Sequence, residues 1–297
     1  MRVDKENENV NYNDEKHVYW DKKDNEKYIS VTTLIEKFSE PFDSDFFSKY
    51  KALEKIIPPA IFKMKKGGLL ASKKIDEAFL KSVDVTETQL KTEAQGFLDE
   101  WDKINKESCE RGTKIHADIE KSFYEGDYSI VKDLPLSKDF VCKKNYFDLA
   151  SVEKGVFPEL MIDYKDGVFR IAGQSDLVIK YGNEIWIKDW KTNKKLDDKS
   201  YFNSKTKKYK SMLYPLNGLM DCNLVHYQIQ LSTYAWMIKQ KHPEYIIKGL
   251  EIIHFDHDGN VSRYDLEYIP DHVENMIKFY KRELEHQEFL RKNAPVR

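Results

Sequence analysis

The stretch of sequence that decides the fold is VFRIAGQSDLVIKYGNEIWIKDWK, residues 168–191. It holds two runs rich in β-branched and aromatic residues, 168–179 and 184–191, on either side of the turn Tyr181-Gly182-Asn183. This pattern predicts two antiparallel strands. A third strand is expected at 156–163, before a turn at 165–167. The region therefore predicts an antiparallel sheet of three strands.

Helical periodicity surrounds this sheet. Upstream, the spacing of apolar residues predicts helices over 46–95, with breaks at Pro58-Pro59 and Gly67-Gly68. A further break is predicted at Gly112-Thr113, before a helix at 114–124 that ends at Gly126. Downstream, it predicts a helix at 224–241, strands at 246–256 and 261–268, and a terminal helix at 271–290. Two short runs, 17–20 and 27–31, predict an N-terminal hairpin, and Ser30 or Thr32 is expected to cap the helix that follows.

Helices segregated around one sheet are typical of an α/β (α+β) fold: a mixed central sheet flanked by helices, with an N-terminal hairpin and helical region. At 297 residues, the chain has room for one large domain or two smaller ones. We expect residues 1–105 to form the hairpin and helical region, packed on the core, and residues 106–297 to form the core.

The charge balance and the cysteines exclude several classes of protein. The chain has 49 Lys and Arg against 51 Asp and Glu, a formal net charge of −2, so any nucleic-acid binding must use a local patch. Three separated cysteines, Cys109, Cys142 and Cys222, exclude a disulfide scaffold and a cysteine-rich zinc module. The N-terminus is polar and no apolar run is long enough to span a membrane. We therefore expect a cytoplasmic protein (in the host cytoplasm if it is viral) with no membrane partner.

The third strand of the predicted sheet carries an acid and an amine on one face. Side chains alternate along a strand, so Asp189 and Lys191 project together, away from Trp190. Alone, the pair is compatible with an exposed ion pair of under about 1 kcal/mol. However, Asp176 lies 13 residues earlier on the neighbouring strand, and Glu159 occupies a similar place on the first strand. Converging carboxylates repel unless a cation joins them, so the three acids predict a Mg²⁺ or Mn²⁺ site.

A histidine on the preceding helix belongs to the same hypothesis. His116 and Glu120 lie four residues apart on one helix face. His116 is either a core histidine bonded to Glu120 or the residue that completes the metal site, and the imidazole makes Mn²⁺ acceptable. In the second case we expect Glu120 to orient His116 rather than to bind the ion.

A polar stripe follows on the helix at 224–241. His226, Gln230 and Tyr234 are spaced four residues apart on an otherwise apolar helix. The stripe predicts either a hydrogen-bonded seam with the sheet or contacts from Gln230 and Tyr234 to a phosphate or to Lys191.

A basic segment lies between the third strand and this helix. Residues 191–210 contain eight lysines and two aspartates, a net charge of +6, with aromatic residues between them. In isolation the segment is compatible with a solvated loop. Beside a metal site it predicts DNA binding, with lysines on phosphates and rings on unpaired bases. The residues expected to bind DNA are Lys194, Lys195, Lys199, Lys205, Lys207, Lys208 and Tyr201.

Five motifs stand in one order along the chain. They are Gly112-Thr113-x-x-His116-x-x-x-Glu120, Glu159, Gly173-x-x-Asp176, Asp189-Trp190-Lys191-Thr192 and Gln230-Leu231-x-x-Tyr234. Their order and spacing resemble the PD-(D/E)XK nuclease superfamily, in particular its RecB-like exonuclease branch. Tyr19-Trp20 and Ser30-Val31-Thr32-Thr33 are similar to the opening of phage-type members.

The resemblance implies a restriction-endonuclease-like core and assigns roles within it. It implies that His116, Asp176, Asp189 and the backbone carbonyl of Trp190 bind the metal, that Lys191 is the catalytic lysine, that Glu159 is an auxiliary acid, and that Gln230 and Tyr234 support the site. Some members hold an iron–sulfur cluster with four cysteines, which this chain cannot supply. Residues 111–114 lack the P-loop pattern, so ATP is not expected either.

The expected function is therefore a divalent-metal-dependent DNA nuclease. The resemblance implies an exonuclease that leaves 5′ phosphates in DNA recombination, replication or processing. Duplex ends or single strands are the expected substrates, and a recombination or replication protein is a candidate partner. Two alternatives stay open: a catalytically inactive nuclease fold that binds DNA or scaffolds a complex, and a structure-specific endonuclease of the same fold.

Overall fold

The computed structural model describes residues 2–131, 134, 136–137, 139–145, 147–204 and 206–293. The chain divides into two units, which we call the sheet unit (residues 1–40 and 112–297) and the helical unit (residues 41–111). The helix α5 (Glu87–Tyr124) belongs to both, because its residues from Gly112 onward lie in the sheet unit. The domain boundary expected at residue 105 stays a prediction.

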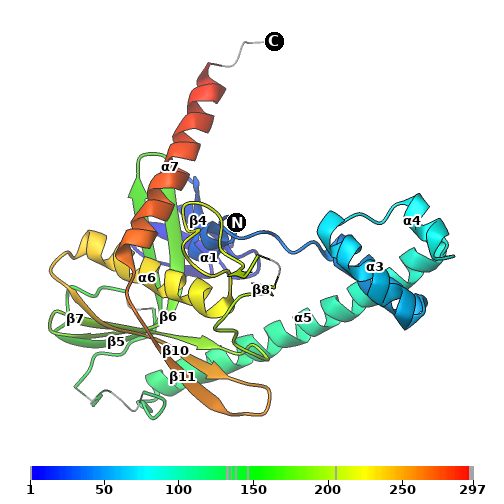
Figure 1. The fold of residues 1–297 in the computed structure, drawn as a ribbon. Coiled ribbons are helices and arrows are strands. Elements are labelled where there is room, and N and C mark those ends of the chain that lie inside the picture. Colours follow the sequence, from blue (N-terminus) through cyan, green and yellow to red (C-terminus); the bar gives the residue numbers. More distant parts are fainter. Residues whose placement is uncertain are drawn as a thin grey trace. The chain divides into compact units, whose positions relative to one another are not determined.

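The sheet unit is built on one mixed sheet, which Figure 1 shows with its flanking helices. The strand order is β1-β2-β3-β4-β6-β7-β10-β11, with β5 paired to β6. The strands are β1 (Lys5–Glu6), β2 (Val10–Asn13), β3 (Val18–Asp21), β4 (Lys27–Ser30), β5 (Lys154–Asp166), β6 (Phe169–Tyr181), β7 (Glu184–Lys191), β10 (Ile246–Phe255) and β11 (Val261–Leu266). β5, β6 and β7 are antiparallel as predicted, while β10 lies parallel to β7. The predicted class, a mixed sheet flanked by helices, is confirmed.

The long strand β6 has two different neighbours along one of its edges. β5 pairs with β6 along its whole length on the other edge. On this edge, β4 pairs in parallel with the start of β6 through Ile171 and Ala172, whereas β7 pairs with its end, from Leu177 to Tyr181. Within the described part of the chain, no strand thus pairs with residues 173–176 on this edge. They contain the predicted metal ligand Asp176, and this opening positions the site.

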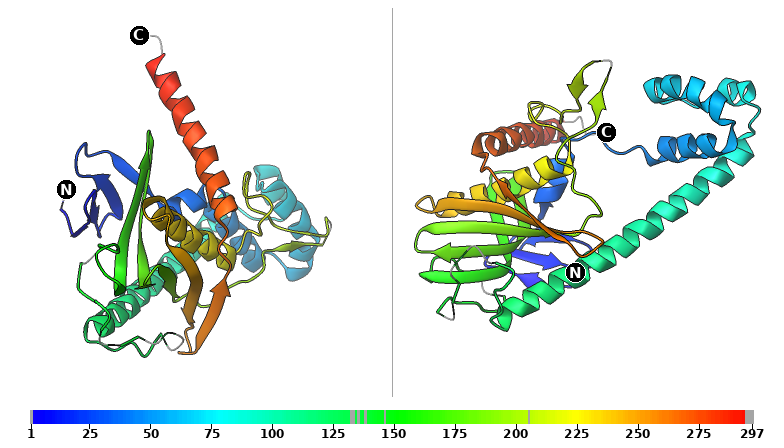
Figure 2. Two further views of the ribbon diagram at one scale, coloured as in Figure 1. Left: turned by 90° about the vertical axis from the view of Figure 1, so that its left-hand side faces the viewer. Right: turned by 60° about the horizontal axis from the view of Figure 1, so that its bottom comes forward.

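Helices cover both faces of the sheet (Figure 2). On one face, α1 (Val31–Glu36), α6 (Asn223–Lys241) and α7 (Pro270–Lys292) pack on residues that include Ile185 and Ile187 of β7. On the other face, the end of α5 packs on β7 through Phe123, whose ring stacks on Trp190 at 6.2 Å. The alternation expected for β7 is therefore observed. None of the helices in the described ranges has the length and apolar character that a membrane span requires.

The N-terminal hairpin is observed, with two strands that the sequence did not indicate. β3 and β4 pair through Tyr19 and Tyr28. Ser30 caps α1 by accepting a hydrogen bond from the Thr33 N–H. β1 and β2 extend the sheet beyond the hairpin. β1 consists of the polar pair Lys5-Glu6 and carries no strand pattern. β2 alternates the buried Val10 and Tyr12 with two asparagines, a strand signal of only four residues.

The helical unit contains α2 (Ser44–Ile56), α3 (Pro59–Ser72), α4 (Glu77–Ser82) and the first part of α5. The break predicted at Pro58-Pro59 is confirmed, since α3 begins at Pro59. The break predicted at Gly67-Gly68 is wrong, because α3 runs through both glycines. A helix tolerates Gly at about 1 kcal/mol per residue, and burial of Phe62 and Leu69 in the core of the unit offsets this cost.

The break predicted at Gly112-Thr113 is also wrong, since α5 continues to Tyr124. A β-carbon on Gly112 would lie 3.1 Å from Oγ1 of Thr192, which follows β7. Gly112 therefore permits a close approach between the helix and the end of the strand, rather than ending the helix. Gly126 follows the end of α5 with a φ of 82°, as expected for a glycine that ends a helix.

Candidate active site

Asp176 sits where β6 and β7 separate. The last pair of the ladder is Leu177 with Lys188. Beyond this pair, the N–H of Trp190, two residues after Lys188, donates to Oδ2 of Asp176, the residue before Leu177, at 2.7 Å. A carboxylate thus replaces a backbone carbonyl as the acceptor. This contact holds Asp176 at the end of β7, and its other oxygen, Oδ1, lies 3.5 Å from Nδ1 of His116.

Lys191 ends β7 on the same face as Asp189, as the alternation predicts. Its Nζ lies 2.6 Å from Asp189 Oδ2 and donates to Gln230 Oε1 at 3.4 Å. The ammonium also lies 4.4 Å from the centre of the Tyr227 ring. Strand β7 and helix α6 thus fix the position of the amine between an acid, an amide and an aromatic ring.

A second layer holds Gln230 in place. Its Nε2 donates to the hydroxyl of Tyr234 at 3.2 Å. Tyr234 is buried against Gly173 of β6, where an added β-carbon would lie 2.6 Å from the tyrosine ring. The glycine of the Gly173-x-x-Asp176 motif is therefore required by the packing of Tyr234.

Three potential ligands come together from three elements. His116 of α5, Glu159 of β5 and Asp176 of β6 each offer one ligand atom, and these atoms lie within 4.8 Å of one another. Glu159 falls opposite Asp176, between the pairs Pro158 with Leu177 and Leu160 with Ser175. Its backbone is left-handed, with a φ of 54°, which is uncommon for a residue other than glycine and typical of functional sites.

The N-terminal strand β1 also reaches this group. Nζ of Lys5 lies 3.5 Å from Oε2 of Glu159. The acids of the site therefore have a lysine on each side: Lys5 beside Glu159 and Lys191 beside Asp189.

Burial and mutual repulsion shift the titration of this group. Burial, together with the charge of Asp176, raises the pKa of Glu159 to about 8 and that of Asp189 to about 6. Burial also acts against charge on Asp176, but His116 and Lys191 outweigh it and lower the pKa of Asp176. Burial opposes a positive His116, yet the surrounding carboxylates, Asp176 first, raise its pKa to about 9. The site thus carries more acid than it can ionise near neutral pH.

The donor set fits a divalent cation. Imidazole and carboxylate oxygens suit Mn²⁺, and the carboxylates alone suit Mg²⁺. Asp189 Oδ2 is buried, and within the described part of the chain its ion pair with Lys191 at 2.6 Å is the polar contact it has. The observed group of side chains differs from the expected ligand set. Glu159 joins His116 and Asp176, while Asp189 is directed to Lys191.

Three predicted contacts have other partners than those expected. Glu120 accepts a hydrogen bond from the hydroxyl of Tyr124 at 3.2 Å, whereas the recorded partner of His116 is Asp176. His226 contacts Asp221 and the hydroxyl of Ser39, so it stands apart from Gln230 and Tyr234. For Trp190, the recorded main-chain contact at the site is made by the N–H group.

The lysines expected to bind DNA lie on the surface. Lys194, Lys199, Lys207 and Lys208 are exposed, and Lys195 is exposed and paired with Asp197. Tyr201 is 73% exposed. Lys205 lies outside the described residues.

Sequence reasoning missed two residues of the site. Tyr227 shares a helix face with Gln230 and Tyr234 at a spacing of three and seven residues, so a search that also allowed a spacing of three would have found it. Lys5 carries no such signal, because only the pairing of β1 and β2 brings it close to Glu159.

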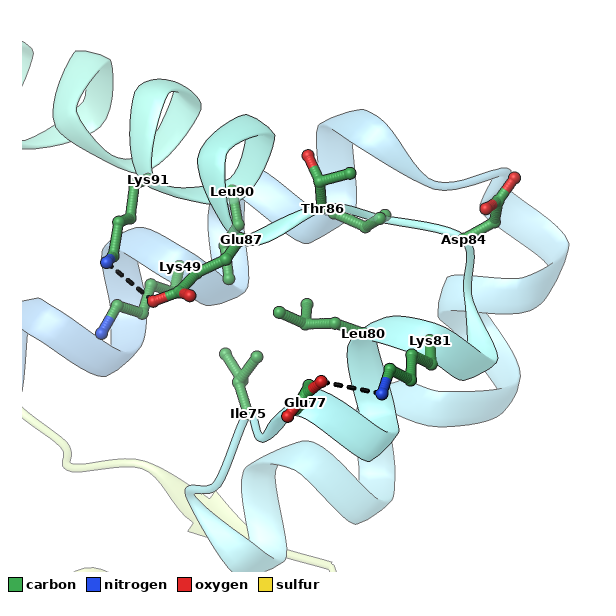
Figure 3. Close-up of a pocket in the computed structure, with 11 residues that line it drawn as sticks. Lys49, Ile75, Glu77, Leu80, Lys81, Asp84, Thr86, Glu87, Leu90 and Lys91 are labelled. Atoms are coloured by element: carbon green, nitrogen blue, oxygen red, sulfur yellow. Dashed lines mark ion pairs between the residues drawn. The ribbon is translucent and has the colours of Figure 1, made fainter.

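The helical unit holds a pocket of about 610 Å³, lined by α4 and its neighbours (Figure 3). None of its lining residues is a predicted site residue. Two ion pairs are drawn in it, Glu77 with Lys81 and Glu87 with Lys91. The pocket therefore does not contribute to the acid and lysine group described above.

Comparisons with known proteins leave the chain without a family. No protein-family model matches it, and no curated protein matches it. Among solved structures, it resembles SSO0001 with a TM-score of 0.26 and 16% identity, over 48% of this chain and 53% of that one. It also resembles a candidate exonuclease from Eubacterium rectale with a TM-score of 0.34 and 10% identity, over 91% of this chain and 83% of that one. Likenesses at this level do not assign an activity.

Proposed function

We propose that the protein is a divalent-metal-dependent deoxyribonuclease of the PD-(D/E)XK type, working as an exonuclease in DNA recombination, replication or processing. One observation carries the proposal. Nζ of Lys191 lies 2.6 Å from Asp189, at a site where ligand atoms of His116, Glu159 and Asp176 lie within 4.8 Å of one another. A positioned ammonium beside a carboxylate-rich metal site is what metal-assisted hydrolysis of a phosphodiester requires.

His116, Glu159 and Asp176 would hold the ion, with Asp189 as a further carboxylate beside them. When bound, Mg²⁺ or Mn²⁺ supplies Lewis acidity that polarises a phosphate oxygen and lowers the pKa of water. Burial and, after it, the charge of Asp176 raise the pKa of Glu159 and of Asp189, and a bound cation would offset both effects.

Lys191 acts on the charge that develops during the reaction. Burial opposes its charge, but Asp189 and Asp176 outweigh burial and raise its pKa, so the amine stays protonated. Its ammonium donates to a non-bridging phosphate oxygen as negative charge grows there. Hydrolysis joins the water oxygen to phosphorus and breaks the bond from phosphorus to the 3′ oxygen, which takes up a proton. The products are a 5′ phosphate and a 3′ hydroxyl.

DNA is the proposed substrate because of the charge next to this site. The exposed lysines Lys194, Lys199, Lys207 and Lys208 follow Lys191 in sequence. Such lysines bind phosphates without reading the base sequence. Duplex ends and single strands are therefore both within the proposal.

The test is digestion of end-labelled linear duplex, circular duplex and single-stranded DNA with Mg²⁺ or Mn²⁺. We expect degradation of linear DNA but not of circles. Lys191→Met and Asp189→Asn should lower the rate at least about 100-fold while DNA affinity is kept. Lys121→Met, at an exposed position of α5, is the matched control and should cleave at the wild-type rate.

Each contrary outcome has a defined meaning. A Lys191→Met protein that degrades DNA at the wild-type rate would refute the assigned lysine. Cleavage of circles would replace the exonuclease mode by an endonuclease mode. DNA binding with no cleavage under either metal would support the inactive, scaffolding alternative.

A further inference from the structure

The segment that links β7 to α6 carries a small two-stranded sheet of its own, β8 (Phe202–Asn203) and β9 (Lys208–Tyr209). We call residues 200–204 and 206–210 the arm. Figure 2 shows it standing off the central sheet. The base of the arm is closed by two hydrogen bonds, one from the Ser200 hydroxyl to the Lys210 carbonyl at 2.7 Å and one from the Lys210 N–H to the Tyr201 carbonyl at 2.8 Å.

The arm presents aromatic rings to solvent. Tyr201 is 73% exposed, Phe202 44% and Tyr209 43%. The rings of Phe202 and Tyr209 contact one another edge to face, with centroids 5.0 Å apart, and none of the three rings belongs to a hydrophobic core. Folding therefore leaves three large apolar surfaces within reach of a ligand.

The charge around these rings selects a polyanion. Lys199, Lys207 and Lys208 are exposed on the same segment. In a duplex, the flat faces of the bases are stacked on one another, so a protein reaches only phosphates, sugars and base edges. In a single strand, the base faces are free to stack on aromatic rings. Rings combined with lysines therefore favour unpaired nucleic acid over a duplex.

The start of this segment is tied to the lysine site. The Tyr227 hydroxyl donates to Asn193 Oδ1 at 3.0 Å, and the same tyrosine ring lies against Lys191. Nε2 of His254 lies 2.7 Å from the carbonyl of Asn193. Asn193, two residues after Lys191, is therefore held in place by the same tyrosine that contacts the Lys191 amine.

The end of the segment is tied down as well. Nζ of Lys210 lies 2.7 Å from Asp221 Oδ2. Asp221 also contacts His226 on the first turn of α6. Asn193, at the start of the linking segment, thus contacts α6 directly, and Lys210, at the end of the arm, is connected to α6 through Asp221.

We propose that the arm binds a single-stranded DNA end by stacking unpaired bases on Tyr201, Phe202 and Tyr209. The binding itself does not depend on the proposed nuclease function. Only the conclusion that the bound single strand is the end of a substrate rests on it. The arm binds the strand through its bases, and the neighbouring lysines hold its phosphates.

The experiment measures binding by fluorescence anisotropy, with full-length Lys191→Met protein so that the DNA stays intact. The probes are a labelled 20-nucleotide single strand and a blunt duplex of the same sequence. Stacking is worth about 1–3 kcal/mol per base, so Tyr201→Ala/Tyr209→Ala should weaken single-strand binding at least about 10-fold. It should change duplex binding by less than about 2-fold. Tyr201→Phe/Tyr209→Phe, which keeps the rings, should bind like the parent.

Two further variants separate stacking from charge and from general effects. Lys207→Gln/Lys208→Gln should weaken both probes and reduce the salt dependence of binding. Phe289→Ala removes a ring that is 62% exposed on α7 and should change neither probe. An equal loss on both probes in the Tyr201→Ala/Tyr209→Ala protein, or no loss, would overturn the proposal. An RNA probe that binds at least 10-fold more tightly than the DNA strand would overturn the choice of DNA.

This result can be separated from the proposed function. Ring-dependent single-strand binding by a wild-type protein that cleaves nothing would support the arm and refute the nuclease. Metal-dependent cleavage with no effect of the rings would support the nuclease and refute the arm.

Discussion

Glu159 lies opposite Asp176 in the β5–β6 register, and its backbone is left-handed at that point. Their carboxylates belong to one group of ligand atoms within 4.8 Å of one another, together with His116. Burial opposes the charge of Glu159, and repulsion from Asp176 on the neighbouring strand adds to this effect, so the pKa of Glu159 is raised. An ionised Glu159 therefore destabilises the folded protein, and this destabilisation can be measured.

Removing the charge of Glu159 should stabilise the metal-free protein at high pH. Its pKa in the folded protein is raised from the ordinary 4.5 to about 8, so the folded protein keeps a proton that the unfolded chain has released. Its contribution to stability is present below about pH 4.5 and is lost as the pH rises towards 8. In the presence of a chelator, we expect the free energy of unfolding of Glu159→Gln at pH 8.5 to be higher than that of the wild type by on the order of 1–3 kcal/mol. The two proteins should match at pH 4.5.

Denaturant unfolding at the two pH values checks this expectation. His116 titrates in a similar range, because the carboxylates around it, Asp176 first and Glu159 among them, outweigh burial and raise its pKa to about 9. The measured difference therefore belongs to Glu159 and His116 as an interacting pair. A Glu159→Gln protein with the same stability difference at pH 4.5 and 8.5 would contradict the raised pKa.

Mn²⁺ should raise the melting temperature of the wild type. An ion that binds only the folded state adds about 2.7 kcal/mol at one hundred times its Kd. The gain should grow from pH 6.5 to 9, because the ion must displace protons from His116 and Glu159. His116→Ala and Asp176→Asn should lose the shift. Asp265→Asn, at an exposed acid on β11, should keep it, and an equal shift in all four proteins would argue against this site.

Gly173→Ala should damage the support of Lys191 from a distance. The new methyl group would lie 2.6 Å from the Tyr234 ring, and overpacking of this kind costs about 1–3 kcal/mol. Displacement of Tyr234 would disturb Gln230, so we expect lower stability together with a lower rate of cleavage. The control is Gly218→Ala, where a β-carbon has no atom within 4 Å. If the two variants have the same melting temperature, the close packing of Tyr234 on Gly173 does not contribute to stability.

Gly67→Ala and Gly68→Ala should each stabilise the helical unit. Both residues lie inside α3, and a β-carbon at either position meets no atom within 4 Å in the described structure. Replacement of Gly by Ala in a helix interior gains up to about 1 kcal/mol. Thermal unfolding of the single and double variants checks this, and a loss of stability in either would show that the glycines serve another contact.

The strands and their acids could be read from the sequence because the signal is local. Alternation along residues 184–191 determines that Asp189 and Lys191 share a face, whatever packs against them. The position of Glu159 is different. Its place beside Asp176 depends on the register of β5 with β6 and on a left-handed backbone, neither of which a single sequence expresses.

The errors have the same origin. A glycine is typical of a helix end, but Gly112 lies inside α5. Its lack of a side chain allows Thr192, which is distant in the sequence, to pack close to the helix. Lys5 stands in a polar N-terminal segment and reaches Glu159 only through the pairing of β1 and β2. The role of Gly112 and the position of Lys5 both depend on contacts between secondary-structure elements. The periodicity of the sequence carries no information about such contacts.

The turn between β6 and β7 has only two residues, Gly182 and Asn183, since Tyr181 pairs with Glu184. Strand β7 alternates between the two faces, so inserting or deleting one residue in this turn would exchange them. Lys188 and Trp190 would then take the places of Asp189 and Lys191. Homologous chains should therefore conserve the number of residues in this turn and favour glycine at 182, where φ is 56°, and an odd-length indel here should mark a lineage that has lost the chemistry of this face.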